Sequence, residues 1–344
     1  MASKSKAPLR RALKIAGVAA CVPAGLFAGF TAVSHGVFHR SNMGTASEIY
    51  YWLKGTRKRM NEPVTWDNYI LESARANAER YSMPAALDFH YKIVGFRVPV
   101  EERSFNGMQN FLLNKRDLND RAVIYLHGGS LLGQPDSNLW HFLDSIARQS
   151  RAEVIVPLYP LAPDHRWKEA FDLIEGLYDH TVAEFGAQNV TLMGDEAGGG
   201  IAAAFAEQLA EEGSEQPAHL VLISPWVDAT LNNPLVNAYQ PNDPLLSAFG
   251  MKRVAKLWAG DTDLDDYHLS PINGNVHGLR NVLVFAGTRE ILYPDARLFY
   301  ERVRATGAHA ELVEGRGLNN DFPLYPLPEA TRAIQTIVDA ISMD

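Results

Sequence analysis

Residues 190–209 constrain the fold more than any other part of the chain. An apolar run at 190–193 is followed by Gly194-Asp195-Glu196-Ala197-Gly198-Gly199 and then by an alanine-rich stretch at 201–209. This order predicts a buried strand, a tight turn and a helix. Glycines on either side of Glu196 permit a sharp turn and close packing of the backbone. We therefore expect Glu196 to stand at the tip of a turn between a strand and a helix.

Strand-like and helix-like segments alternate along the rest of the chain. Runs typical of strands lie at 91–98, 108–113, 122–126, 153–158, 189–193, 219–223, 281–285 and 311–313. Helical patterns lie at 136–149, 167–185, 197–212, 293–306 and 328–342. This alternation predicts an α/β fold with a mostly parallel sheet and helices on both faces. Residues 229–273 interrupt the pattern with prolines and acidic side chains, which indicates an insertion.

The composition narrows the classes of partner. A net charge of −8 argues against binding of the folded part to nucleic acid or to an anionic membrane surface. A single cysteine excludes an intramolecular disulfide and a cysteine-based metal site. The histidines show no metal-ligand spacing, so we expect no metal and no cofactor. The sequence gives no indication of the oligomeric state.

The N-terminus has the features of a targeting segment. Several basic residues precede an uncharged run from Ile15 to Val33, which has about the length that a helix needs to cross a bilayer. We expect residues 1–34 to act as a signal anchor that holds the body of the protein outside the cytoplasm. A cleaved signal peptide, which would make the protein secreted, and a helix without a targeting role are the alternatives.

A second glycine turn carries chemical information. His127-Gly128-Gly129-Ser130 directly follows the apolar run at 122–126. Turns of this type direct backbone N–H groups at an oxygen that gains negative charge during acyl transfer, which makes them an oxyanion hole. We expect Gly128 and Gly129 to be donors, together with the N–H of Ala197.

Together with these two turns, three more motifs carry a family resemblance. They are Tyr159 with Leu161-Ala162-Pro163-Asp164-His165, Ser224-Pro225-Trp226, and Gly287-x-x-Glu290-Ile291-Leu292. Over residues 88–344 the chain resembles the hormone-sensitive-lipase-like branch of the α/β-hydrolases, a family of carboxylesterases and acetyl-esterases. The resemblance implies an eight-stranded sheet with a helical cap over the site. It divides the chain into cap helices at 35–86 and a core at 87–344 that carries a cap insertion at 229–273.

The resemblance also implies a catalytic triad, which this chain departs from twice. Glu196 stands at the position of the nucleophilic serine, and Asn320 of Gly317-Leu318-Asn319-Asn320-Asp321-Phe322 stands at that of the histidine. Glu290 matches the acid. No later residue supplies a histidine, because the last one in the chain is His309. We therefore expect a degenerate triad, in which the Glu196 carboxylate occupies the oxyanion hole.

These departures favour a pseudo-esterase that binds a small apolar or ester-like ligand under the cap, or a partner protein, without hydrolysis. One alternative is an active hydrolase of short acyl or acetyl esters that uses groups not recognised above. Another is a structural or interaction protein. A carboxylate nucleophile, as in haloalkane dehalogenases and epoxide hydrolases, is a further catalytic alternative, but its second step needs a histidine.

Overall fold

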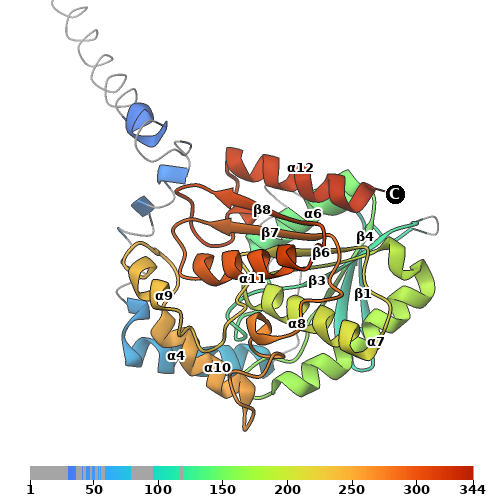
Figure 1. Ribbon diagram of the computed structural model, residues 1–344, viewed down its shortest axis with the longest axis horizontal. Coiled ribbons are helices and arrows are strands. Elements are labelled where there is room, and N and C mark those ends of the chain that lie inside the picture. The colour runs from blue at the N-terminus through green and yellow to red at the C-terminus, as the bar shows by residue number, and fades with distance from the viewer. Residues whose placement is uncertain are drawn as a thin grey trace, which may run out of the picture.

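An eight-stranded sheet forms the centre of the molecule (Figure 1). The computed structural model describes residues 30–35, 41, 44–46, 49–50, 53, 55, 59–78, 96–116 and 119–343. Its strands are β1 (Val100–Phe105), β2 (Met108–Leu113), β3 (Ala122–Leu126), β4 (Glu153–Pro157), β5 (Val190–Asp195), β6 (His219–Ile223), β7 (Val282–Gly287) and β8 (Ala310–Gly315). They follow the order β1-β2-β4-β3-β5-β6-β7-β8, and only the β1–β2 and β2–β4 pairs are antiparallel.

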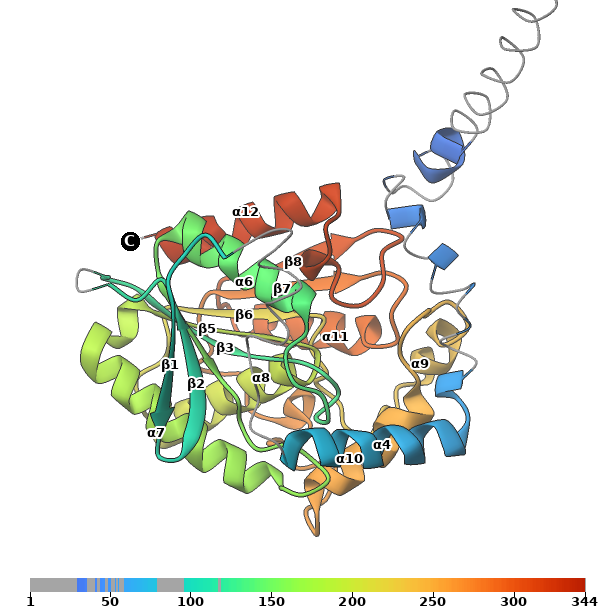
Figure 2. The same ribbon diagram turned by 180° about the vertical axis from the view of Figure 1, so that it is seen from behind.

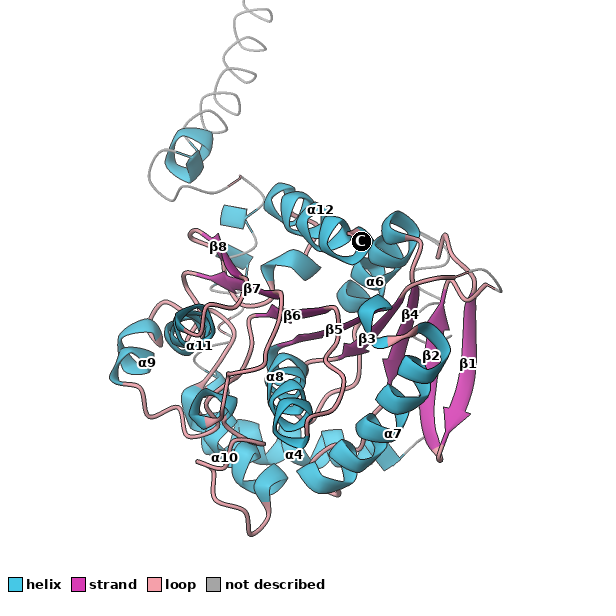
Figure 3. Cartoon of the chain, turned by 45° about the vertical axis from the view of Figure 1, so that its right-hand side comes forward, coloured by secondary structure: helices cyan, strands magenta, loops and turns pink. Residues whose placement is uncertain are grey.

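Helices cover both faces of this sheet (Figure 3). The longer ones are α4 (Pro63–Ala78), α6 (Ser137–Ser150), α7 (Trp167–Phe185), α8 (Glu196–Glu212), α10 (Ala248–Ala259), α11 (Tyr293–Ala305) and α12 (Pro328–Ser342). The shorter ones are α9 (Pro234–Tyr239), η1 (Ala187–Asn189), η2 (Pro271–Asn273) and η3 (Phe322–Leu324). Helices α6 and α12 share one hydrophobic core with the sheet, and α7, α8, α10 and α11 share the other. Strands β3, β4, β5 and β7 are buried along their whole length, as their apolar runs require between two helical layers.

The expected mostly parallel, two-sided sheet is confirmed, and the sequence patterns did not predict its strand β1. A strand was expected at 91–98, of which 91–95 lie outside the described residues and 96–98 form no strand. The first described strand is β1, and its sequence Val-Glu-Glu-Arg-Ser-Phe is largely exposed. Charged side chains are typical of a sheet edge, where they discourage pairing with another chain. Apolar patterning therefore fails to identify this strand.

Helices α4 and α10 pack against each other beside the sheet (Figure 2). Trp66 of α4 is 1% exposed, and the backbone of Gly250 on α10 lies directly against its ring. The Ser247 hydroxyl donates to Asn61 Oδ1 at 2.8 Å, and Asn77 Nδ2 donates to the Leu132 carbonyl at 2.9 Å. These two helices fall within the segments expected to form a cap, although the boundaries proposed for that cap remain a prediction.

The expected membrane segment at 15–33 lies almost entirely outside the described residues. Only its last residues, at 30–33, are described, within a helix at 30–35. None of the described helices has both the length and the apolarity needed to span a bilayer. The signal anchor therefore stays a prediction.

The contact between Gly250 and Trp66 predicts a cost for any side chain at position 250. The Cβ of Gly250→Ala would lie 1.6 Å from Trp66 Cε2, so α4 must move away from α10. We expect a loss of about 1–3 kcal/mol in the free energy of unfolding, measured by urea denaturation, together with faster proteolysis within α4. Gly176→Ala is the control, because its Cβ would meet Phe105 at an ordinary 3.4 Å. Equal stability of the two variants would contradict the assigned packing.

Candidate functional site

Glu196 stands at the tip of the turn between β5 and α8, where the sequence places it. Its backbone adopts a left-handed φ of 44°, which is strained for a residue with a side chain. The turn packs closely against the end of β3, since a Cβ at Gly198 would lie 2.0 Å from the Leu126 carbonyl oxygen. Since β3 and β5 are parallel neighbours, the turns that follow them meet at the same edge of the sheet.

The Glu196 carboxylate is bound by the turn that follows β3. One carboxylate oxygen, Oε2, accepts the N–H of Gly129 at 2.9 Å and the N–H of Ser130 at 2.7 Å. The other, Oε1, accepts the Ser130 hydroxyl at 2.6 Å. The side chain also stands in the first turn of α8, where the helix dipole favours an anion. The side chain of Glu196 thus takes up the donors of the turn that was expected to form the oxyanion hole.

The identity of these donors corrects part of the expected oxyanion hole. Gly129 is a donor, but the N–H of Gly128 donates to Asp195 Oδ1 at 2.8 Å. The N–H of Ala197 is not among the donors to Glu196 in the described part of the chain, and its expected role in an oxyanion hole stays a prediction. Ser130, at a left-handed φ of 54°, supplies two hydrogen bonds in their place. The physical reason is that Asp195, which the motif leaves without a role, binds the first N–H of the turn.

Asp195 and His127 are buried supports of the two turns. Asp195 Oδ1 also accepts the Tyr125 hydroxyl at 2.8 Å, and burial raises the pKa of the Asp195 carboxyl to about 7. His127 Nδ1 donates to the Gly128 carbonyl at 2.7 Å, and its ring stacks on that of Tyr159 with centroids 4.6 Å apart. Burial lowers the pKa of His127 to about 4, so its imidazole is neutral at pH 7.

Glu290 and Asn320 do not form the acid–base pair of a triad. Glu290 is fully buried, and its Oε2 accepts the Ser224 hydroxyl at 2.9 Å. Ser224 Oγ in turn accepts the N–H of Asp321 at 2.9 Å. Asn320 Nδ2 donates to Asp321 Oδ2 at 2.6 Å, and in the described chain no hydrogen bond joins Asn320 to Glu290. Burial raises the pKa of Glu290 well above its ordinary value, and the charges of Asp243 and Glu196 raise it further.

A cavity of about 260 Å³ opens over Glu196. Among the residues that line it are four acids and two tyrosines, namely Tyr69, Asp136, Asp195, Glu196, Asp321 and Tyr325. The last loop thus contributes Asp321 to this cavity, whereas the motif match pointed to its neighbour Asn320. Sequence reasoning also missed Asp136 and Tyr69, which come from the start of α6 and from α4 and carry no motif.

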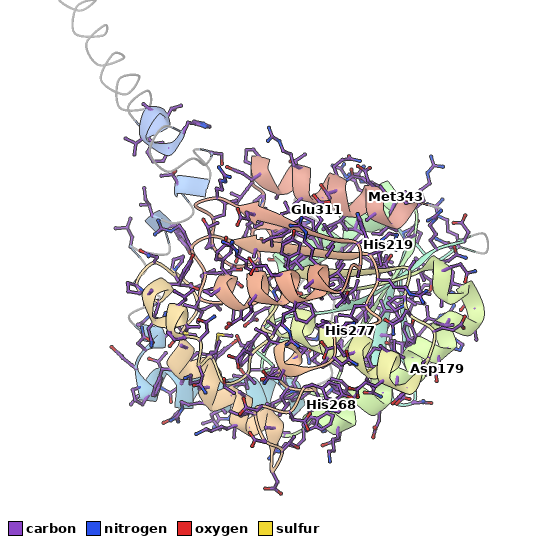
Figure 4. The ribbon with its side chains drawn as sticks, viewed as in Figure 1. Asp179, His219, His268, His277, Glu311 and Met343 are labelled. Atoms are coloured by element: carbon purple, nitrogen blue, oxygen red, sulfur yellow. The ribbon has the colours of Figure 1, made fainter. Side chains whose placement is uncertain are left out.

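No histidine lines this cavity in the described part of the chain. His219, His268 and His277 lie at separate places in the molecule (Figure 4). In the same described residues, no group of three or more histidine, cysteine, aspartate or glutamate side chains is arranged to hold a metal ion. The side chains around Glu196 therefore offer hydrogen-bond acceptors and phenol groups, but no imidazole base.

A second, apolar pocket beside the first turn of α8 is small. Its volume is about 20 Å³, close to that of a single water site. Ala197 and Ile201 of α8 line it, together with the rings of Trp226, Trp258 and His268. Little apolar space therefore remains on this side of the elbow.

The hydrogen bond from the Ser130 hydroxyl to Glu196 predicts a loss of stability when that hydroxyl is removed. Ser130→Ala removes a hydrogen bond to a carboxylate but keeps a Cβ at a left-handed φ, so we expect a loss of about 1.5–3 kcal/mol in the free energy of unfolding. Ser130→Gly removes the same bond but relieves the backbone, and it should cost roughly 1 kcal/mol less. Urea denaturation measures both losses. Parent-like stability of Ser130→Ala would refute a contribution from this bond.

The raised pKa of Asp195 predicts a pH dependence of stability. Since the folded pKa of about 7 exceeds the unfolded value, this group's contribution is complete below about pH 4 and is lost as the pH rises towards 7. Asp195→Asn keeps an acceptor oxygen but removes the titration. From pH 5 to pH 7 the free energy of unfolding of the parent should fall. That of Asp195→Asn should fall by about 1–2 kcal/mol less over the same range. Urea denaturation at each pH checks this, with exposed Asp164→Asn as the control; parallel curves would contradict it.

Comparisons with known proteins agree with this architecture. A family model described as the alpha/beta hydrolase fold matches residues 123–324. An esterase of Acinetobacter venetianus is 29% identical over 230 residues, which are 65% of this chain and 76% of that protein. The crystal structure of a putative esterase from Staphylococcus aureus aligns with a TM-score of 0.79 and 32% identity, and it covers 86% of this chain and 99% of its own.

A further crystal structure is that of an esterase from the bacterial hormone-sensitive lipase family. It aligns with a TM-score of 0.68 and 25% identity over 82% of this chain and 99% of its own. The eight-stranded sheet, the two turns at its edge and these similarities lead to one assignment. The chain belongs to the α/β-hydrolase fold family, in its hormone-sensitive-lipase-like esterase branch.

Proposed function

We propose that this protein is a pseudo-esterase, which uses an esterase scaffold to bind a small molecule or a partner without hydrolysing an ester. The observation that carries this proposal is the position of the Glu196 carboxylate on the N–H groups of Gly129 and Ser130. A serine esterase needs a nucleophile at this turn and free donors beside it. Here a single side chain replaces the nucleophile and fills the donors.

The surroundings of Glu196 also support the loss of hydrolysis. Asn320 cannot accept a proton as the histidine of a triad does, and its amide is bonded to Asp321. Loss of the serine or the histidine alone costs about 10⁶-fold in a serine protease triad. What normally remains is catalysis by the oxyanion hole, and Glu196 occupies that hole.

The competing function is ester hydrolysis, which the printed names of the relatives favour. It would need a nucleophile other than a serine at the turn. Glu196 could act in that role only after it breaks its hydrogen bonds to the turn, and an ester formed on it would then need a base to activate water. The alternatives differ in one measurable property, which is turnover by the unaltered protein.

Hydrolysis of p-nitrophenyl acetate and butyrate by the full-length protein tests the proposal. We expect the parent to match the buffer background, and Glu196→Ser combined with Asn320→His to exceed the parent at least about tenfold. The double variant frees the N–H donors, and Glu290 Oε1, which has no partner in the described chain, is available to orient the new imidazole. The small apolar pocket should favour acetate over butyrate.

Two controls sharpen this test. Asn320→His alone keeps Glu196 in the oxyanion hole and should remain at background. Glu196→Ser alone opens the hole but supplies no base, and it should fall below the double variant. Esterase-like turnover by the parent, abolished by Glu196→Gln, would contradict the proposal and assign a catalytic role to the carboxylate.

A further inference from the structure

Most of the exposed hydrophobic side chains lie in the segments expected to form the cap or just before them. Ten large hydrophobic side chains are exposed in the described part of the chain, and eight of these belong to residues 33–71 or to the insertion at 229–273. Four of the eight lie on α4, α9 and α10. Single exposed hydrophobic residues are ordinary, but a group of them on neighbouring elements indicates an interaction site.

Helix α4 is apolar on two opposite faces. Its inner face buries Trp66 against Gly250 of α10. On its outer face, Val64 is 69% exposed and Leu71 is 50% exposed. These two residues share a face because they are about two turns apart, whereas Trp66 is only two residues from Val64 and points to the other side. A helix that packs on one face normally carries polar residues on the other, so the outer face of α4 needs an explanation.

Helix α10 continues this outer face. Its Phe249 is 42% exposed, and Arg253, one turn later, places its Cζ 5.6 Å from the centroid of the Phe249 ring. The same Arg253 donates to Asp67 of α4, which lies between Val64 and Leu71 on the helix surface. The exposed side chains of the two packed helices, which run side by side in Figure 2, therefore form one continuous surface.

This surface has the opposite charge to the chain as a whole. Helix α10 carries Lys252, Arg253 and Lys256 and no acidic residue, and α4 carries Arg75 one turn after Leu71. The two helices together have four basic and two acidic side chains, and one of the acids is bonded to Arg253. Since the chain has a net charge of −8, the outer face of α4 and α10 stands out as both apolar and basic.

We propose that the outer face of α4 and α10 docks on the surface of a bilayer that contains anionic phospholipids. Surface-bound helices combine apolar side chains, which enter the boundary of the acyl chains, with lysine and arginine, which bind the lipid phosphates. Val64, Leu71 and Phe249 are placed for the first role, and Lys252 and Lys256 for the second. The net charge of −8 disfavours an anionic surface for the whole molecule, so the contact is confined to this face.

The place of this face along the chain fits the same occupant. Helix α4 follows the apolar run at 15–33, for which a role as a membrane anchor is expected. The stretch between Val33 and Val64 could span at most about 100 Å, which lets α4 reach a bilayer that holds such an anchor. A second copy of the chain fits less well, because a two-fold contact would set the cations of α10 against those of the other copy. The inference goes beyond the proposed function and does not depend on whether the site hydrolyses an ester.

Fluorescence quenching in vesicles tests the proposal on the full-length chain. In a Cys21→Ser background, which removes the single native cysteine, Leu71→Cys carries an environment-sensitive nitrobenzoxadiazole label. Leu298→Cys on α11 is the matched control, because Leu298 is 43% exposed on a helix outside this face. The vesicles contain equal parts of phosphatidylcholine and phosphatidylglycerol. We expect a nitroxide on the acyl chains to quench the label at position 71 at least about twice as strongly as that at position 298.

Each other outcome of this comparison contradicts the proposal. Equal quenching of the two labels, or quenching of neither, would overturn it. A label at position 71 whose emission shifts to the blue without being quenched would assign the face to a protein contact, such as a second copy of the chain, and would also overturn it. Because both labelled residues are exposed, neither label requires the core to repack.

The variant Lys252→Gln combined with Lys256→Gln tests the charge of the face. We expect quenching of the label at position 71 to fall by about half or more, as it should for the parent in vesicles of phosphatidylcholine alone. Arg148→Gln combined with Arg332→Gln changes the net charge equally at exposed positions on α6 and α12, and it should behave as the parent does. Equal losses in the two double variants, or no loss in either, would refute a specific role of the α10 cations.

Discussion

The hydrogen bonds between Glu196 and the turn after β3 are the interaction on which the rest of the site depends. They join two turns that follow neighbouring parallel strands, and they satisfy the N–H groups of Gly129 and Ser130 within the protein. In an acyl-transfer enzyme such donors are preorganised for charge that develops on a substrate. In this chain they bind a carboxyl group of the protein itself. The strained turn is thereby stabilised without a ligand.

The Glu196 side chain also affects the pKa values of its neighbours. Burial is the largest cause of the raised pKa of Asp195, Asp321 and Glu290, and the charge of Glu196 adds to all three. A triad histidine would offset part of this negative charge when protonated, but the amide of Asn320 does not. In the proposed pseudo-esterase, Glu196 at the serine position and Asn320 at the histidine position therefore act together. The described residues that line the cavity accordingly include four acids and no imidazole.

Sequence patterning predicted the scaffold well because the buried strands and their helices repeat with clear periods. It placed Glu196 correctly because glycines force the turn. It misassigned the donors because a motif does not record which N–H group a distant carboxylate binds, and Asp195 takes that of Gly128. It did not single out Asp321 because alignment to a motif fixes one position along the chain, whereas the backbone of the loop decides which further side chains line the cavity.

The family determines the scaffold here, and the site determines what that scaffold does. Two spaces lie beside the same turn, an apolar pocket of about 20 Å³ and an acidic cavity of about 260 Å³. An acyl ester needs apolar space for its chain and free donors for its carbonyl oxygen, and this site provides little of either. In the proposed pseudo-esterase, the loss of hydrolysis thus follows from one change at this turn, which is a carboxyl group where a serine esterase keeps a neutral nucleophile.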